Sequence, residues 1–197
     1  MHIVGQSRQL ILASASPRRS ELLGRTGIPF VVDTSDYPED EVPGLSPAEL
    51  AVRHALEKAT DVARRWEEGL VIGADTIVVL DDIVYGKPST PEDARRMLCS
   101  LSGRPHEVIT GLAVLGVPEG IVVTKAVTTR VIFRDLAVEE IEWYLSTGEP
   151  FDKSGAYGIQ GCGAVLVDRI EGDFFNVVGL PLAQTVMILR DFGVTLP

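Results

Sequence analysis

The sequence predicts an α/β protein with a mixed sheet, and three observations support this. Short β-branched apolar runs alternate with helix-forming segments in the first half of the chain. Two longer apolar segments, 108–117 and 121–133, are separated only by a turn at 118–120, which indicates a hairpin of antiparallel strands. The length of 197 residues suits one domain, with enough chain for two lobes around a cleft. We therefore expect residues 1–197 to fold as a single domain with a mixed sheet.

Capping residues mark the starts of the first two predicted helices. Ser16 suits the N-cap position and Pro17 the first helical position of the first helix. Ser46 and Glu49 have the spacing of a capping box, in which each side chain bonds to the backbone N–H of the other residue. The second helix is expected to extend to about residue 66 or 67.

The other elements follow from apolar runs that are bounded by turn residues. The expected strands cover residues 9–14, 31–33, 69–80 (in two stretches separated at 73–76), 83–85, 108–117, 121–133 and 164–170. The expected helices cover residues 17 to about 27, 47–67, 91 to about 103, 138–145 and 182–192. Residues 152–163 are glycine-rich and are expected to be irregular.

Composition excludes several classes of function. The net charge of −10 argues against binding to nucleic acid polymers, which favour strongly basic surfaces. No run is long and apolar enough to span a bilayer, and no signal peptide is recognisable, so we expect a cytoplasmic protein that does not bind membranes. Cys99 and Cys162 are too few for a zinc site, and we expect both to be reduced and structural. His2, His54 and His106 show no metal-ligand spacing, so we interpret them as structural or solvated.

A candidate anion site lies where the first strand meets the first helix. Ser14 and Ser16 precede or begin the helix, and Arg18 and Arg19 lie in its first turn. A helix N-terminus with hydroxyl groups and arginines can bind an anion such as a phosphate. An ordinary capped helix with solvated arginines explains the same residues, and both interpretations stay open on this segment alone.

A second candidate is Asp75, which interrupts an apolar strand. A buried carboxylate is unfavourable unless it is paired, hydrogen-bonded or bound to a metal. The sequence therefore favours a metal ligand or a general base over a carboxylate bonded only to neighbouring backbone. Lys87 follows closely in a Gly-Lys-Pro turn, which is not a phosphate-binding P-loop because the required glycine spacing is absent.

The glycine-rich segment 152–163 is the third candidate. Its glycines permit close approach of a ligand to the backbone, and Gln160 can form paired hydrogen bonds with a base or a peptide edge. A structured surface loop is the alternative. Together, the three candidates indicate an α/β enzyme that acts on phosphates.

Six ordered segments sharpen this interpretation. They are LASASPRR at 12–19, GADT at 73–76, GKP at 86–88, LSGR at 101–104, DKSGAYGIQG at 152–161 and VGLPL at 178–182. In this order they resemble the Maf family of nucleotide pyrophosphatases, over about residues 10–189. The resemblance implies a mixed α/β fold like that of inosine-triphosphate pyrophosphatases, with two lobes beside a nucleotide groove. It also implies dependence on Mg²⁺ or Mn²⁺, and a homodimer is common in the family.

The resemblance also implies roles for individual residues. Asp75 matches the proposed catalytic acid or base, and it would hold the metal together with Glu39. The other matching active-site residues are Ser14, Arg18, Lys58 and Lys87, of which the two lysines are expected to be catalytic. Lys58 lies on the second predicted helix beside a stripe of alanines, from which it can reach a groove. We expect Arg19 to bind substrate beside Arg18.

Base preference divides the family into a branch for dTTP and UTP and a branch for 7-methyl-GTP. Arg18, Thr76 and Gln160 match the specificity positions of the first branch, although Ser154 stands where alanine is frequent. The expected activity is therefore hydrolysis of dTTP and UTP to the monophosphate and pyrophosphate. Two alternatives stay open: hydrolysis of 7-methyl-GTP or non-canonical purine nucleotides, and a nucleotide-binding regulator of cell division or septum formation.

Overall fold

A computed structural model of the chain describes residues 8–40 and 42–197, and within these residues it contains one seven-stranded mixed sheet. The strands are β1 (Leu10–Leu12), β2 (Phe30–Val32), β3 (Gly69–Leu80), β4 (Ile83–Tyr85), β5 (Pro105–Val117), β6 (Ile121–Phe133) and β7 (Val167–Glu171). Their order is β2-β1-β3-β5-β6-β7, and β4 pairs with β3. The pairs β1–β2 and β1–β3 are parallel, and the others are antiparallel. The α/β prediction with a mixed sheet is confirmed.

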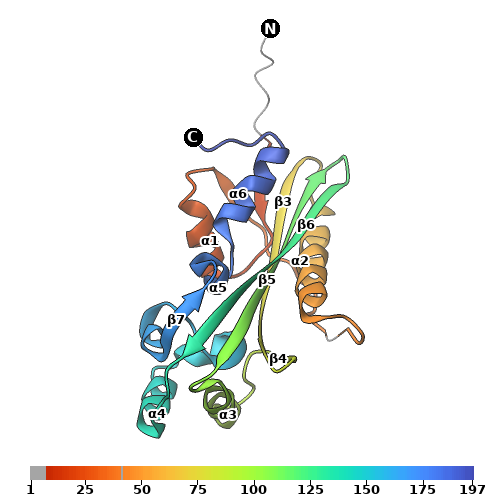
Figure 1. Ribbon diagram of the computed structural model, residues 1–197. Coiled ribbons are helices and arrows are strands. Elements are labelled where there is room, and N and C mark those ends of the chain that lie inside the picture. Colours follow the sequence, from red (N-terminus) through yellow and green to blue (C-terminus); the bar gives the residue numbers. More distant parts are fainter. Residues whose placement is uncertain (1–7, 41) are drawn as a thin grey trace.

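Helices cover both faces of this sheet (Figure 1). They are α1 (Pro17–Gly24), α2 (Pro47–Ala63), α3 (Pro91–Leu101), α4 (Val138–Ser146), α5 (Phe174–Val178) and α6 (Leu182–Asp191), together with the 3₁₀ segments η1 (Glu149–Asp152), η2 (Ser154–Ala156) and η3 (Gly161–Leu166). Figure 1 shows α2 on one side of the long strands and α1, α5 and α6 on the other. Among the described residues, no helix has the length and hydropathy needed to cross a membrane.

The core on the face opposite α2 is divided into two main clusters. One lies between α1, α6 and the first half of β3, and includes Leu22, Ile72 and Leu189. The other packs α3 and α4 against the second half of β3, and includes Leu98 and Tyr144. The two clusters lie toward opposite ends of the long strands, which is the division into two lobes that the sequence suggested.

Two glycines allow α2 to lie unusually close to the sheet. A Cβ atom on Gly73 of β3 would come within 2.0 Å of the carbonyl oxygen of Ala55, and one on Gly111 of β5 within 2.1 Å of the carbonyl oxygen of Ala51. Cβ atoms do not approach oxygens this closely, so only glycine is compatible with this packing. The glycine at 73 therefore serves helix packing.

Strand β3 has a stretch of free edge in its middle. On one side it pairs with β5 along residues 69–79. On its other side β1 pairs with residues 70–72 and β4 with residues 78–80, so residues 73–77 have no strand partner there among the described residues. This opening in the sheet lies at the GADT segment, where the functional residues were predicted.

Three predictions about secondary structure were wrong. Residues 73–76 do not interrupt β3, because alternate side chains of this strand are buried on opposite faces and even Asp75 is buried. The strand predicted at 164–170 begins only at Val167, since residues 161–166 form η3. Helix α5 was missed, because its five residues, FFNVV, are too few for periodicity to distinguish a helix from a strand. The prediction for His2 lies outside the described residues.

Candidate active site

A cavity of about 350 Å³ opens at the free edge of β3. Its walls come from the β1–α1 turn, the loop after β2, α2, β3, the turn after β4, the glycine-rich segment and the loop after α5. Every predicted site residue lines it: Ser14, Arg18, Arg19, Glu39, Lys58, Asp75, Thr76, Lys87 and Gln160. The structure thus brings together residues that lie up to 146 positions apart in the sequence.

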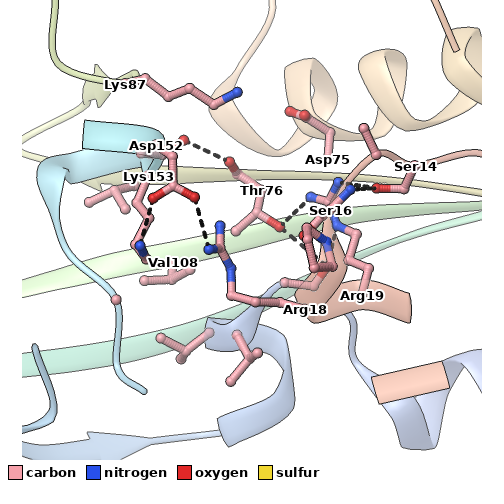
Figure 2. Close-up of a pocket in the computed structure, with 18 of the residues that line it drawn as sticks. Ser14, Ser16, Arg18, Arg19, Asp75, Thr76, Lys87, Val108, Asp152 and Lys153 are labelled. Carbon is pink, nitrogen blue, oxygen red and sulfur yellow. Dashed lines mark hydrogen bonds and ion pairs between the residues drawn. The ribbon is translucent and has the colours of Figure 1, made fainter. Parts of the chain in front are cut away.

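The alternation of β3 directs two neighbouring residues to different parts of the site. Asp75 lies on the face that α2 covers, where its carboxylate meets Lys58. Thr76 lies on the opposite face, where its hydroxyl meets Arg19. In Figure 2, Asp75 and Lys87 lie above Thr76, and Arg18 lies below it. One strand with a free edge therefore presents both faces to a single cavity.

Two carboxylates converge on one buried ammonium group. Nζ of Lys58 lies 2.7 Å from Oδ1 of Asp75 and 2.5 Å from Oε1 of Glu39. The side chains of Lys58 and Asp75 are 9% and 7% exposed, whereas that of Glu39 is 47% exposed. Partial burial would raise the pKa of Glu39, but the charge and hydrogen bond of Lys58, with further help from Lys87 and Arg19, lower it below its ordinary value. Glu39 is thus held as a carboxylate at the mouth of the cavity.

Arg19 is fixed inside the wall of the cavity. Its Nε donates to the carbonyl oxygen of Gly179 at 2.8 Å, Nη1 donates to Oγ of Ser14 at 3.2 Å, and Nη2 donates to Oγ1 of Thr76 at 3.0 Å. Burial lowers the pKa of Arg19, and the negative charges of Asp75 and Glu39 oppose that shift. The guanidinium group is therefore a preoriented positive charge at the base of the cavity.

The helix-cap interpretation of Ser16 is only partly confirmed. Ser16 is the N-cap residue of α1, but its side chain accepts no hydrogen bond from the first turn. Instead, the backbone N–H of Ser16 donates to Oγ of Ser14 at 3.3 Å. Ser14, which also accepts from Arg19, therefore organises the turn, and the first-turn N–H groups of α1 have no side-chain acceptor from Ser16.

The buried hydroxyl group of Thr110 orients the side chain of Thr76. Oγ1 of Thr110 lies 3.0 Å from Oγ1 of Thr76 and donates to the carbonyl oxygen of Asn176 at 3.0 Å. Because Thr110 uses its only proton on Asn176, Thr76 is the donor between the two threonines. The carbonyl oxygen of Gly179, 3.5 Å away, is a second acceptor for the hydroxyl of Thr76, and the hydroxyl oxygen itself accepts from Arg19.

Asp152 and Lys153 are site residues that the sequence interpretation missed. Oδ2 of Asp152 accepts from Nη1 of Arg18 at 3.1 Å, and Oδ1 accepts from Nζ of Lys153 at 2.6 Å. Partial burial raises the pKa of Asp152, but its hydrogen bonds and ion pairs with Lys153 and Arg18 outweigh this and lower it. The adjacent Asp-Lys pair at the start of the glycine-rich segment was the available signal, since both residues line the cavity.

Two glycines of the segment 152–163 lie close to side chains of other residues, and one of them, Gly158, also lines the cavity. A Cβ atom on Gly158 would lie 2.7 Å from Cε of Lys153, and one on Gly161 would lie 2.7 Å from Oε2 of Glu149. The close approach is thus to side chains of the protein itself. Gln160, between these glycines, is half-buried and lines the cavity as expected.

The carboxylates suit a divalent cation that is completed by substrate. Within residues 8–40 and 42–197, no group of three histidine, cysteine or carboxylate side chains could hold a metal without other ligands. Mg²⁺ is typically bound by one or two carboxylates, water and substrate phosphates. Asp75 and Glu39, which converge on the ammonium of Lys58 beside an open cavity, match that mode of binding.

Comparisons with known proteins give matches over almost the whole chain. Residues 9–192 match the family described as Maf-like protein. The chain is 52% identical over 186 residues to a dTTP/UTP pyrophosphatase of Symbiobacterium thermophilum, covering 94% of this chain and 95% of that protein. It is 52% identical over 188 residues to one of Geobacter metallireducens, with 95% and 98% covered. It is 49% identical over 190 residues to one of Methanosarcina barkeri, with 96% of each chain covered.

Proposed function

The chain belongs to the Maf-like protein family, and from this premise we propose that it hydrolyses nucleoside triphosphates, with dTTP and UTP preferred, to the monophosphate and pyrophosphate. One observation carries the proposal: Asp75, Lys58 and Glu39 form a charged cluster in a cavity that Arg18, Arg19 and Lys87 also line. Cations around a cavity with a buried carboxylate suit phosphoryl chemistry. The names of the relatives, dTTP/UTP pyrophosphatase, support the same reaction.

The cations bind the triphosphate and offset its charge. Arg19 is fixed by three hydrogen bonds, so it can stabilise negative charge without reorganisation. Lys87 and Arg18 extend from other walls of the cavity and are suited to contact the phosphates and the departing pyrophosphate. Lys58 holds the carboxylates of Asp75 and Glu39 in place.

Asp75 is the proposed acid or base of the reaction. Its hydrogen bond to Lys58 orients the carboxylate on the floor of the cavity, where it can accept the proton of a water molecule that attacks the α-phosphorus. Asp75 and Glu39 would also hold Mg²⁺ or Mn²⁺. When bound, such an ion offsets charge on the triphosphate and polarises its oxygens.

Base recognition is assigned to Gln160, with Arg18 and Thr76. Gln160 has an amide that can form paired hydrogen bonds with the edge of a pyrimidine base. Arg18 and Thr76 line the same cavity and complete the proposed specificity residues. The proposed substrate is a free nucleotide and not a nucleic acid polymer, in keeping with the net charge of −10. A homodimer stays a prediction that analytical ultracentrifugation can check.

Product analysis tests the proposal. The protein is incubated with dTTP, UTP, CTP, GTP, ITP or 7-methyl-GTP, with Mg²⁺, Mn²⁺ or EDTA, and monophosphate and pyrophosphate are measured. We expect both products from dTTP and UTP, and none with EDTA. Strong preference for another nucleotide would refute the base assignment, and nucleotide binding without hydrolysis would favour the regulator.

Asp75→Asn tests the assignment of the catalytic residue. Asparagine can still accept the hydrogen bond of Lys58, so the fold should persist while turnover is lost. The matched control is Asp81→Asn, which removes an exposed carboxylate that pairs with Arg104 outside the cavity. Near-normal turnover by Asp75→Asn would refute the proposed mechanism.

A further inference from the structure

Glu149 lies outside the cavity lining but bonds to the segment that carries Gln160. We propose that Glu149 is a positioning residue for base discrimination, which fixes the loop that presents Gln160 to the nucleotide. The proposal rests on the proposed function and deepens it, because it names what holds the specificity residue in place.

The carboxylate of Glu149 binds the backbone just after Gln160. Its Oε2 accepts from the N–H of Cys162 at 2.9 Å, and its Oε1 accepts from the N–H of Gly163 at 3.1 Å. Two successive backbone N–H groups directed at one carboxylate form an anion-binding nest. In this protein the occupant of the nest is its own side chain and not a ligand phosphate.

Tyr144 binds the backbone just before Gln160. Its side chain is fully buried in the core against α3, and its hydroxyl donates to Oε1 of Glu149 at 3.0 Å. The same hydroxyl oxygen accepts from the N–H of Gly158 at 3.1 Å. Tyr144 of α4 and Glu149 of η1 therefore bind the backbone on both sides of Gln160.

Two glycines of this segment lie against the side chains of Glu149 and Tyr144. Gly161 has a φ of 64°, and a Cβ atom there would lie 2.7 Å from Oε2 of Glu149. A Cβ atom on Gly163 would lie 2.1 Å from the carbonyl oxygen of Gly158 and 2.8 Å from the hydroxyl oxygen of Tyr144. A side chain at position 161 would push against Glu149, and one at position 163 against the backbone of Gly158 and the hydroxyl of Tyr144, so glycine at both positions is compatible with this packing.

This arrangement separates base recognition from the reaction centre. Neither Glu149 nor Tyr144 lines the cavity, and the hydrogen bonds that fix Asp75 and Lys58 involve neither of them. Discrimination between bases by paired hydrogen bonds requires that Gln160 be held in one geometry. Loss of the Glu149 carboxylate should therefore affect the choice of nucleotide more than the rate of the chemical step.

Glu149→Gln is the primary test. The amide places an NH₂ group where one carboxylate oxygen now accepts from the backbone, so one N–H of the nest loses its acceptor. We expect the ratio of kcat/KM between UTP and GTP to fall by roughly tenfold, the size of one hydrogen bond. The change should lie mainly in KM for UTP, with kcat nearly unchanged.

Two further variants show whether the effect passes through Gln160. If it does, Glu149→Gln combined with Gln160→Ala should discriminate no worse than Gln160→Ala alone. Tyr144→Phe keeps the buried ring but removes the bonds to Glu149 and Gly158, and it should reproduce part of the loss even if Glu149→Gln folds poorly.

Glu140→Gln is the matched control. Glu140 lies in the first turn of α4, the helix that carries Tyr144; it accepts from the N–H of Ala137 at 2.9 Å and pairs with Arg134. Its loss should lower stability without changing discrimination. If Glu149→Gln and Tyr144→Phe also lower only the melting temperature, and the UTP-to-GTP ratio stays at the wild-type value, the proposal is overturned.

The failure of the proposed function would be seen separately. Absence of hydrolysis by the wild-type protein would refute the activity, and the same variants would then be compared by calorimetric binding of UTP and GTP. Discrimination in binding that is equal in the wild-type protein and Glu149→Gln would overturn the role of Glu149.

Discussion

Gly73 lies directly against the backbone of Ala55, so closely that a Cβ atom on Gly73 would come within 2.0 Å of the Ala55 carbonyl oxygen. This contact sets the distance between α2 and β3. Because the helix is so close, the long side chain of Lys58, one turn further along α2, places its ammonium 2.7 Å from Asp75. The glycine two positions before the proposed catalytic carboxylate thus determines whether the ion pair forms.

Gly73→Ala should be strongly destabilising. The new methyl group would also lie 3.0 Å from Cβ of the fully buried Ala59, so α2 must shift outward. We expect the free energy of unfolding to fall by about 3 kcal/mol, as for other overpacked cores. Gly24→Ala is the control, because a Cβ atom there meets nothing within 4 Å. Equal urea unfolding midpoints for the two variants would contradict this account of the packing.

Lys58→Met should lower the free energy of unfolding, because the buried carboxylate of Asp75 loses its ion-pair partner. Methionine preserves much of the apolar stem but removes the ammonium, which leaves a carboxylate that is 7% exposed without its buried cation. Breaking a buried pair on one side typically costs about 3–5 kcal/mol, and we expect a loss of that order. In Lys58→Met combined with Asp75→Asn the loss should be smaller, since no buried charge is stranded. Additive losses in urea titrations would show that the pair is not coupled.

His106 should make stability depend on pH. It is buried between Phe133 and Tyr157, and burial lowers its pKa from 6.5 to about 4. The unfolded chain therefore binds a proton at higher pH than the folded protein. The contribution of His106 to stability is complete above pH 6.5, decreases as the pH falls to 4, and is absent below that value. The total is about 3 kcal/mol, because each pKa unit corresponds to about 1.4 kcal/mol.

His106→Gln is the comparison for this pH effect. Other titrating groups are common to both proteins, so the difference between the two curves isolates His106. Urea unfolding at pH values from 4 to 7 should give a flatter dependence for the variant. Parallel curves would mean that His106 does not titrate with the lowered pKa.

Thr110→Val should lower both the stability of the protein and its activity. Valine has nearly the same shape but leaves the carbonyl oxygen of Asn176 without its donor, and it leaves the hydroxyl of Thr76 with only the more distant carbonyl oxygen of Gly179 as an acceptor. We expect the free energy of unfolding to fall by about 1–2 kcal/mol, and kcat/KM by roughly tenfold, because Thr76 no longer orients Arg19. Thr110→Ser, which keeps the hydroxyl, should restore most of both. If serine restores stability but not activity, the hydroxyl of Thr110 does not act through Thr76.

The local sequence was sufficient for most of the elements, and the family resemblance named most of the site residues. The capping box at Ser46 and Glu49 is present as predicted, and the apolar run at 121–133 is the strand β6. These features depend on residues within a few positions of one another, so periodicity and capping rules apply to them. The residues that the family resemblance named, from Ser14 to Gln160, all line the cavity.

Only the tertiary structure determined what supports those residues. The contacts of Glu149 with Tyr144 and the glycine-rich segment, and of Asp152 with Arg18, carry no periodic signal in the sequence. Asp152 lies 134 positions from Arg18, so neither residue predicts the other. The free edge of β3 likewise depends on where β1 ends and β4 begins. The sequence pattern therefore indicates which side chains have the chemistry for binding or catalysis. Packing between residues far apart in the sequence decides which of these side chains come into contact.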